Sequence, residues 1–157
     1  MKGNAKLIQT LNEILTAELV AINQYFVHAK MRENWGYHRL AKATREESIG
    51  EMKHADALIE RILFLEGMPN VQRLAKVRLG ETVVEQLELD LKLEVEAIPR
   101  LNKAIAQARN AQDNGTCEML EHILHSEEEH AEWLGAQLTL IEQVGEQNYL
   151  AQQIHHS

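Results

Sequence analysis

Six residues with metal-binding or acid-base side chains interrupt apolar stripes of helical spacing, at places where a hydrophobic core is expected. They are Glu18, Glu51, His54, Glu94, Glu127 and His130. Residues three apart are neighbours on one face of a helix, so each Glu-x-x-His pair presents a single ligand surface. Burying an unpaired polar group costs about 2–7 kcal/mol, and an ionised carboxylate costs more. Because Lys and Arg are absent from these stripes at the same level, the sequence predicts a pair of divalent metal ions as the compensating charge.

The six positions are spaced as an internal repeat. Glu18 precedes Glu51 by 33 residues, and Glu94 precedes Glu127 by the same 33. The intervals 18 to 94, 51 to 127 and 54 to 130 are each 76 residues. Such a repeat predicts two similar helical hairpins related by an approximate two-fold axis, with one metal on each side. A Glu from each of two helices and a Glu-x-x-His from each of two others is the known ligand pattern of ferritin-like di-metal bundles.

The positioning elements are helices. Hydrophobic periodicity and turn signals predict an all-α, ferritin-like antiparallel four-helix bundle in a single domain of residues 1–157. The expected helices are 5–34, 37–65, 82–111 and 116–144, followed by a short fifth helix at 146–153. The short linkers at 35–36 and 112–115 indicate antiparallel neighbours, whereas residues 66–81 are long enough for a crossover along the bundle. Pro99 should kink the third helix or loosen one turn.

Composition narrows the function further. The formal net charge is −8, which disfavours nucleic acid as a partner and suits cations. Cys117 is the single cysteine and has no internal disulfide partner. The N-terminus lacks the apolar run of a signal peptide, and no apolar stretch is long enough to span a bilayer, so we expect a cytoplasmic protein without a membrane role.

Several segments resemble bacterioferritin, and the resemblance extends over nearly the whole chain. They are residues 18–26, 47–56, 59–67, 126–130 and 148–150. The resemblance implies iron storage with ferroxidase activity: Fe(II) is oxidised by O2 or H2O2 to a bridged di-Fe(III) state. It also implies that the mineral is deposited inside a hollow homo-oligomeric shell of twenty-four subunits.

The same resemblance assigns roles to the six catalytic and metal-binding residues. Glu18 and His54 would bind one iron. Glu94 and His130 would bind the other, and Glu51 and Glu127 would bridge both. Ligand chemistry alone also accepts manganese, cobalt or zinc. Tyr25 and Asp90 lie about one turn from Glu ligands and are expected to orient them.

Met52 distinguishes this family from other ferritins. It follows Glu51 directly, so about 100° of helical rotation carries it from the metal face toward the outside of the bundle. An outward apolar strip lies nearby, at Leu19, Asn23, Phe26 and Ile49. The resemblance implies a haem b shared between two subunits, with one Met52 from each as axial ligand. The alternative is an interface methionine that packs without haem.

Three positions depart from the pattern of the family. Where many bacterioferritins have His, Asp and Asp on the inner wall, this chain has Glu46, Gly50 and Ser126. Glu46 can still bind iron, but the cluster is weaker, which puts a dedicated cavity-wall iron site in doubt.

Other functions remain open on the sequence. One is a haem-binding or electron-transfer shell with a structural di-metal site, and another is a helical assembly without metal. A third relative is the DNA-protecting mini-ferritin, which the intact ligand set, the fifth helix and the absence of a basic tail disfavour. Iron release would require a reductant, for which a ferredoxin-like protein is the expected partner.

Overall fold

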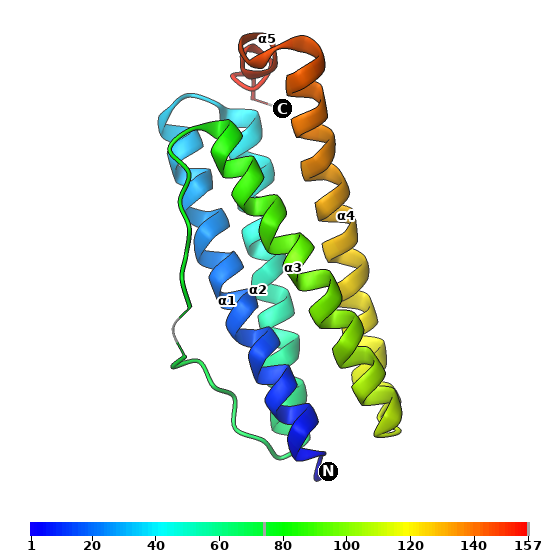
Figure 1. Cartoon of the computed structure of the whole chain (residues 1–157). Helices are drawn as coiled ribbons and strands as arrows, with labels where there is room; N and C mark the ends of the chain where they lie inside the picture. The colour runs from blue at the N-terminus through cyan, green and yellow to red at the C-terminus, as the bar shows by residue number, and fades with distance from the viewer. Residues whose placement is uncertain (74, 157) are drawn as a thin grey trace.

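The computed structural model describes residues 1–73 and 75–156, and its described part is helical with turns and one long extended connection (Figure 1). The helices are α1 (Ala5–Asn34), α2 (His38–Phe64), α3 (Val83–Asn110), α4 (Asn114–Val144) and the short α5 (Glu146–Ala151). The predicted all-α bundle of four long helices and a short fifth one is therefore confirmed. The fourth helix begins two residues before its predicted start, because Asp113 caps it by accepting a hydrogen bond from the amide of Thr116.

Polar side chains set the starts of three helices. Asn4, Thr82 and Asp113 each accept hydrogen bonds from backbone amides two or three residues further on, which satisfies donors that a helix start leaves free. Gly36 and Gly145 have φ of 90° and 87°, a region that residues with a Cβ seldom adopt. These two glycines permit the turns that send the chain into α2 and α5.

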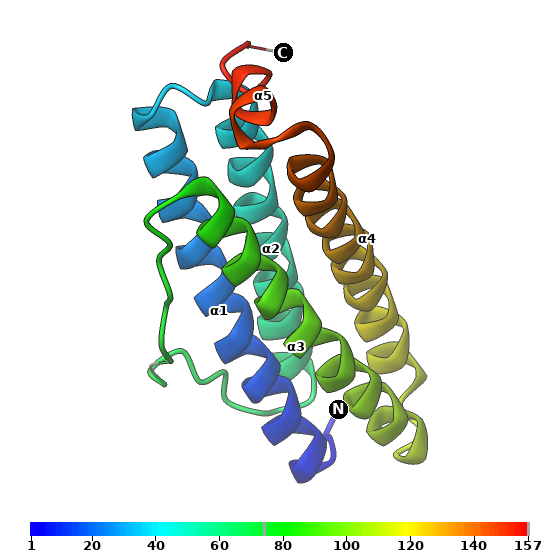
Figure 2. The ribbon, with the colours of Figure 1, turned by 45° about the horizontal axis from the view of Figure 1, so that its top comes forward.

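The connection between α2 and α3, hereafter the crossover, runs along the outside of α1 from one end of the bundle to the other (Figures 1 and 2). Asn12 of α1 holds its first part. The Asn12 side-chain amide donates to the carbonyl of Met68 at 3.1 Å, and its oxygen accepts from the amide of Asn70 at 2.7 Å. The predicted single long crossover is thus confirmed, and it lets α3 start beside the α1–α2 turn.

Two apolar clusters fill the bundle. The larger includes Leu11, Leu58 and Leu120, and the smaller includes Leu40 and Leu87. Along α2, α3 and α4, five of the six candidate ligands occupy the stretch between these clusters; the sixth, Glu18, is on α1. The polar centre is therefore enclosed by apolar packing toward both ends of the bundle.

The third helix is continuous through Pro99, which is exposed. The proline therefore does not end the helix, since the groups it crowds face outward.

Among the described residues, no helix combines the length and the apolar character needed to span a membrane.

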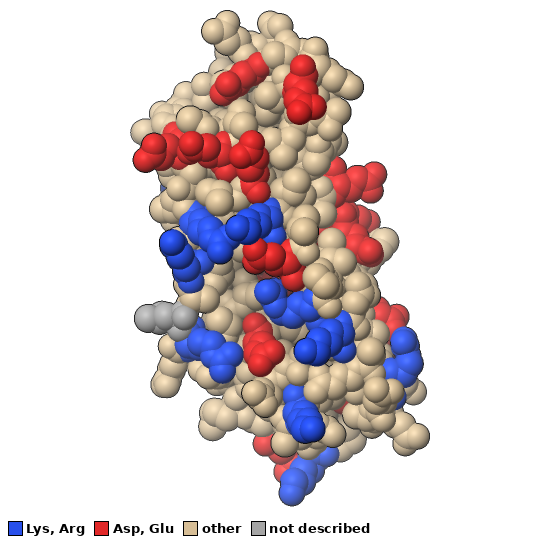
Figure 3. All heavy atoms as spheres, viewed as in Figure 1, with Lys and Arg blue, Asp and Glu red and all other residues tan. Residues whose placement is uncertain are grey.

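Charge is unevenly distributed on the surface. Although the net charge is −8, Lys and Arg gather over the middle of the face that carries α1, α3 and the crossover (Figure 3).

Candidate metal centre

All four long helices deliver a candidate ligand to the middle of the bundle. The ligands are Glu18 on α1, Glu51 and His54 on α2, Glu94 on α3, and Glu127 and His130 on α4. Each is buried, with at most 7% of its surface exposed. The four glutamates therefore point into the bundle and not toward solvent. On each helix, apolar residues one turn away share the face of the ligands, and burial of this apolar face directs the ligands into the bundle.

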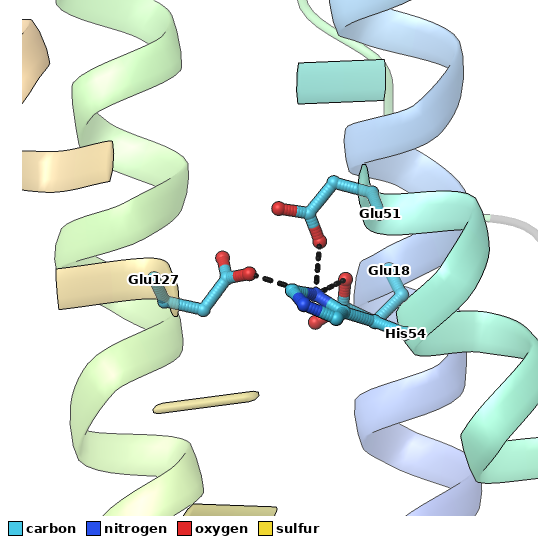
Figure 4. A group of neighbouring side chains, drawn as sticks. All are labelled: Glu18, Glu51, His54 and Glu127. Atoms are coloured by element: carbon cyan, nitrogen blue, oxygen red, sulfur yellow. Dashed lines mark hydrogen bonds and ion pairs between the residues drawn. The ribbon is translucent and has the colours of Figure 1, made fainter. Parts of the chain in front are cut away.

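Four of these side chains form a first group. The ligand atoms of Glu18, Glu51, His54 and Glu127 all lie within 4.8 Å of one another. Nδ1 of His54 lies 3.0 Å from Oε1 of Glu127, 3.2 Å from Oε2 of Glu51 and 3.6 Å from Oε2 of Glu18 (Figure 4). Three carboxylates and one imidazole from three helices thus converge on a volume that a single cation can fill.

A second group forms around His130. Its Nδ1 lies 3.1 Å from Oε1 of Glu94 and 3.6 Å from Oε2 of Glu47. Glu47, Glu51 and His130 also satisfy the spacing of a metal site, so Glu51 takes part in both groups. The sequence analysis missed Glu47. Its position one turn before Glu51 on the same helix face was the available signal.

Without metal ions, several side chains of the centre have raised pKa values and bind protons. Burial by itself lowers the pKa of His54, but the contacts with Glu127 and Glu51 outweigh it and raise the pKa to about 10. Burial raises the pKa of Glu94 to about 8, against the opposing effect of His130. Burial also raises the pKa of Glu127. Because each shift favours the protonated form, the cluster holds protons that a metal ion would displace.

Three carboxylate oxygens in the centre lack hydrogen-bond partners among the described residues. They are Oε2 of Glu18, Oε2 of Glu94 and Oε1 of Glu127, all fully shielded from solvent, and the last has only its ion pair with His54. Buried acceptors without a hydrogen-bond partner are rare because each costs roughly 1–3 kcal/mol. Divalent cations would satisfy these oxygens, so the donor set fits metal ions.

The two residues expected to orient the ligands behave differently. The hydroxyl of Tyr25 donates to Oε1 of Glu94, which agrees with the expectation. Asp90 instead accepts a hydrogen bond from Gln24 at 2.9 Å and contacts Nδ1 of His28 at 2.9 Å. The expectation for Asp90 is therefore corrected: its carboxylate turns toward α1, because Gln24, His28 and Arg32 there supply its polar partners.

Met52 lies on the outer surface, away from the six ligands. It is 53% exposed, and Phe26 and Ile49 are 43% and 44% exposed. These three side chains leave apolar surface exposed on the outside of α1 and α2. An accessible thioether beside two apolar residues fits a haem or another subunit.

The three positions that depart from the family pattern lie near the second group. Glu46 is exposed, and Gly50 and Ser126 are half-buried. Gly50 leaves open space where a side chain would otherwise stand, since a Cβ there would meet nothing within 4 Å.

Comparison with known proteins agrees with the geometry of the buried centre. The ferritin-like domain family matches residues 8–144. The chain is 49% identical over 152 residues to the bacterioferritin of Mycobacterium leprae, covering 97% of this chain and 96% of the relative. It is 49% identical to the Streptomyces coelicolor bacterioferritin, covering 96% and 90%, and 44% identical to that of Brucella melitensis, covering 95% and 92%.

Proposed function

Because the chain belongs to the bacterioferritin family, we propose that it stores iron and that its buried centre is a ferroxidase site. The observation that carries this proposal is the convergence of six buried ligand-type side chains from four helices, with carboxylate oxygens left unpartnered. No described residue donates a hydrogen bond to those oxygens, so the substrate Fe(II) is the fitting partner.

The contacts support a division of labour among the ligands. Glu18 and His54 hold one Fe(II), and Glu94 and His130 hold the other. Glu51 bridges, which agrees with its place in both groups. Glu127 also bridges, since it contacts His54 and interacts with Glu94. Carboxylate oxygens and imidazole nitrogen form a ligand set that suits iron.

The reaction removes one electron from each of two Fe(II) ions. H2O2 accepts these two electrons and two protons and yields two waters. Alternatively, O2 accepts the two electrons and two protons and yields H2O2. The protein supplies a closed, preorganised ligand set in which Tyr25 fixes Glu94 by its hydrogen bond. The protons held by His54 and Glu94 leave as the cations bind.

Membership of the same family also supports a proposal for the wider assembly. We propose a cytoplasmic homo-oligomer of twenty-four subunits that encloses the Fe(III) mineral. In this proposal the thioether of Met52 and its copy on a second subunit would hold one haem b, and this group would supply electron-transfer chemistry. A ferredoxin-like reductant would deliver the electrons. The exposed apolar surface of Phe26, Ile49 and Met52 supports such a contact.

The test compares two neighbouring isosteric variants. Glu127→Gln removes a proposed bridging carboxylate, and Glu128→Gln makes the same change of charge at an exposed position of α4. Stopped-flow absorbance should show Fe(II) oxidation slowed by roughly 10- to 100-fold in Glu127→Gln only, in keeping with the usual cost of losing a metal-site group. Equal rates in both variants would favour the competing function, a haem-binding shell with a structural di-metal site.

A further inference from the structure

A pocket of about 220 Å³ opens to the outside of the bundle directly over the proposed metal centre. It lies between α1, α3 and the crossover. Its buried floor is formed by the carboxylates of Glu18, Glu94 and Glu127. Its rim carries three cationic side chains, Lys76, Arg78 and Arg100, together with Glu96. The rim is part of the basic region on this face (Figure 3).

The rim has the wrong charge for attracting Fe(II). Cationic side chains at a pocket mouth raise the local concentration of anions and lower that of cations. In the metal-free protein the negative charges of the floor and of Glu96 offset the positive charges of the rim. The electrostatic attraction of an anion to the pocket is therefore weak. Two divalent cations on the floor would reverse this balance and make the whole pocket attractive to an anion.

The basic rim is held in place by a buried network. The backbone amide of Arg78 donates to Oε1 of Gln24 at 3.2 Å, and the Gln24 amide donates to Asp90 at 2.9 Å. Two residues further on, the amide of Gly80 donates to Nε2 of His28 at 3.1 Å. Gln24 and His28 have no exposed surface, and Asp90 is 1% exposed. This network fixes the crossover backbone at Arg78. The Arg78 guanidinium can therefore bind an anion in the pocket without the entropic cost of ordering a flexible loop.

A second constraint acts at the end of the crossover. A Cβ at Gly80 would come within 2.6 Å of the backbone nitrogen of Gln86 in α3. The glycine therefore permits the crossover to pack directly on the start of α3. Among the described residues, the Arg78 guanidinium has a long ion pair as its one polar contact, 3.9 Å from Oε1 of Glu96, and the Arg78 side chain is 39% exposed. Such an exposed pair contributes little and yields readily to a stronger anionic partner.

We propose that this pocket is an oxyanion site that binds inorganic phosphate across Lys76, Arg78 and Arg100 once divalent cations occupy the carboxylate floor. The inference rests on the proposed metal centre. Arginine forks pair with two oxygens of a tetrahedral anion, and lysine adds a point charge, so three such groups around one opening suit a phosphate dianion. Phosphate would then enter from the outer face, close to where Fe(III) is formed.

The test uses the intact protein loaded with Co(II), whose visible spectrum reports binding to the centre before any phosphate is added. Phosphate is then titrated and followed by the same spectrum and by 31P relaxation. The test variant is Arg78→Gln/Arg100→Gln. The matched control is Lys92→Gln/Lys103→Gln, which removes the same charge from exposed positions of α3 that do not line the pocket.

Phosphate should bind Co(II)-loaded wild type and the control, and should not bind the metal-free protein. Its affinity should fall by at least about tenfold in Arg78→Gln/Arg100→Gln, the usual effect of losing a charge-assisted hydrogen bond. Equal affinities in the two double variants, or equal binding with and without Co(II), would overturn the inference. Normal Co(II) binding with no phosphate response overturns the oxyanion site alone, whereas absence of Co(II) binding overturns the proposed metal centre as well.

Discussion

Nδ1 of His54 on α2 lies 3.0 Å from Oε1 of Glu127 on α4. This contact joins the α1–α2 hairpin to the α3–α4 hairpin across the middle of the bundle. In the metal-free protein a proton on the imidazole mediates it, as the raised pKa of His54 indicates. A metal ion placed there would hold the two hairpins together through charged ligands from both. Stability, metal binding and protonation are therefore linked at one point.

The first prediction concerns stability. Glu18→Gln removes a buried carboxylate whose Oε2 has no partner among the described residues. The metal-free variant should be as stable as wild type or more stable by roughly 1–3 kcal/mol, since this buried carboxylate has no hydrogen bond on Oε2 and only a long 3.6 Å ion pair with His54 to offset its desolvation. Co(II), which stabilises the folded state by binding it, should raise its Tm less than it raises that of wild type. Calorimetry with and without Co(II) measures both effects.

The control for this prediction is Glu13→Gln, an exposed position of α1. It should leave both the metal-free Tm and the Co(II) effect close to wild type. A metal-free Glu18→Gln protein that is clearly less stable than Glu13→Gln would show that the carboxylate is satisfied without metal.

The second prediction concerns protons. The pKa of His54 is about 10 and that of Glu94 about 8, so both groups carry protons in the metal-free protein at pH 7. Metal binding requires their deprotonated forms and must release protons. The release should be seen as acidification of a weakly buffered sample on Co(II) addition. Co(II) affinity should therefore rise as the pH increases from 6 toward about 10. An affinity independent of pH would contradict the assigned protonation.

The third prediction tests the ligand that the sequence did not reveal. Glu47 shares a possible metal position with Glu51 and His130 but is absent from the group around His54. Glu47→Gln should weaken the second Co(II) by roughly 10-fold and leave the first unchanged, the size of effect expected for a supporting group. A two-phase Co(II) titration measures this. Glu60→Gln, exposed on the same helix, is the matched control.

The fourth prediction separates haem from iron oxidation. Met52→Leu keeps the apolar volume but removes the thioether that the proposed haem requires. The variant should lose haem absorbance on purification and keep the wild-type rate of Fe(II) oxidation. Met68→Leu, at a more exposed methionine, should retain haem. Haem retained equally in both variants would favour the alternative of an interface methionine.

The sequence predicted the outline of the metal centre because its signals are local and repeated. Glu18, Glu51, Glu94 and Glu127 interrupt apolar stripes at matching intervals, and helical periodicity alone fixes which face of each helix is buried. Helix content, hairpin order and the inward direction of the ligands were therefore accessible without coordinates.

Tertiary structure decided which side chains meet across helices. Glu47 joins the His130 group, and Asp90 turns from the ligands toward His28. The placement of Arg78 over the carboxylates depends on the path of the crossover, which has no periodicity to read. Hydrophobic periodicity predicts only the direction in which a side chain leaves the axis of its own helix. Contacts between elements depend on helix offset and crossing, which the packing of the whole chain sets.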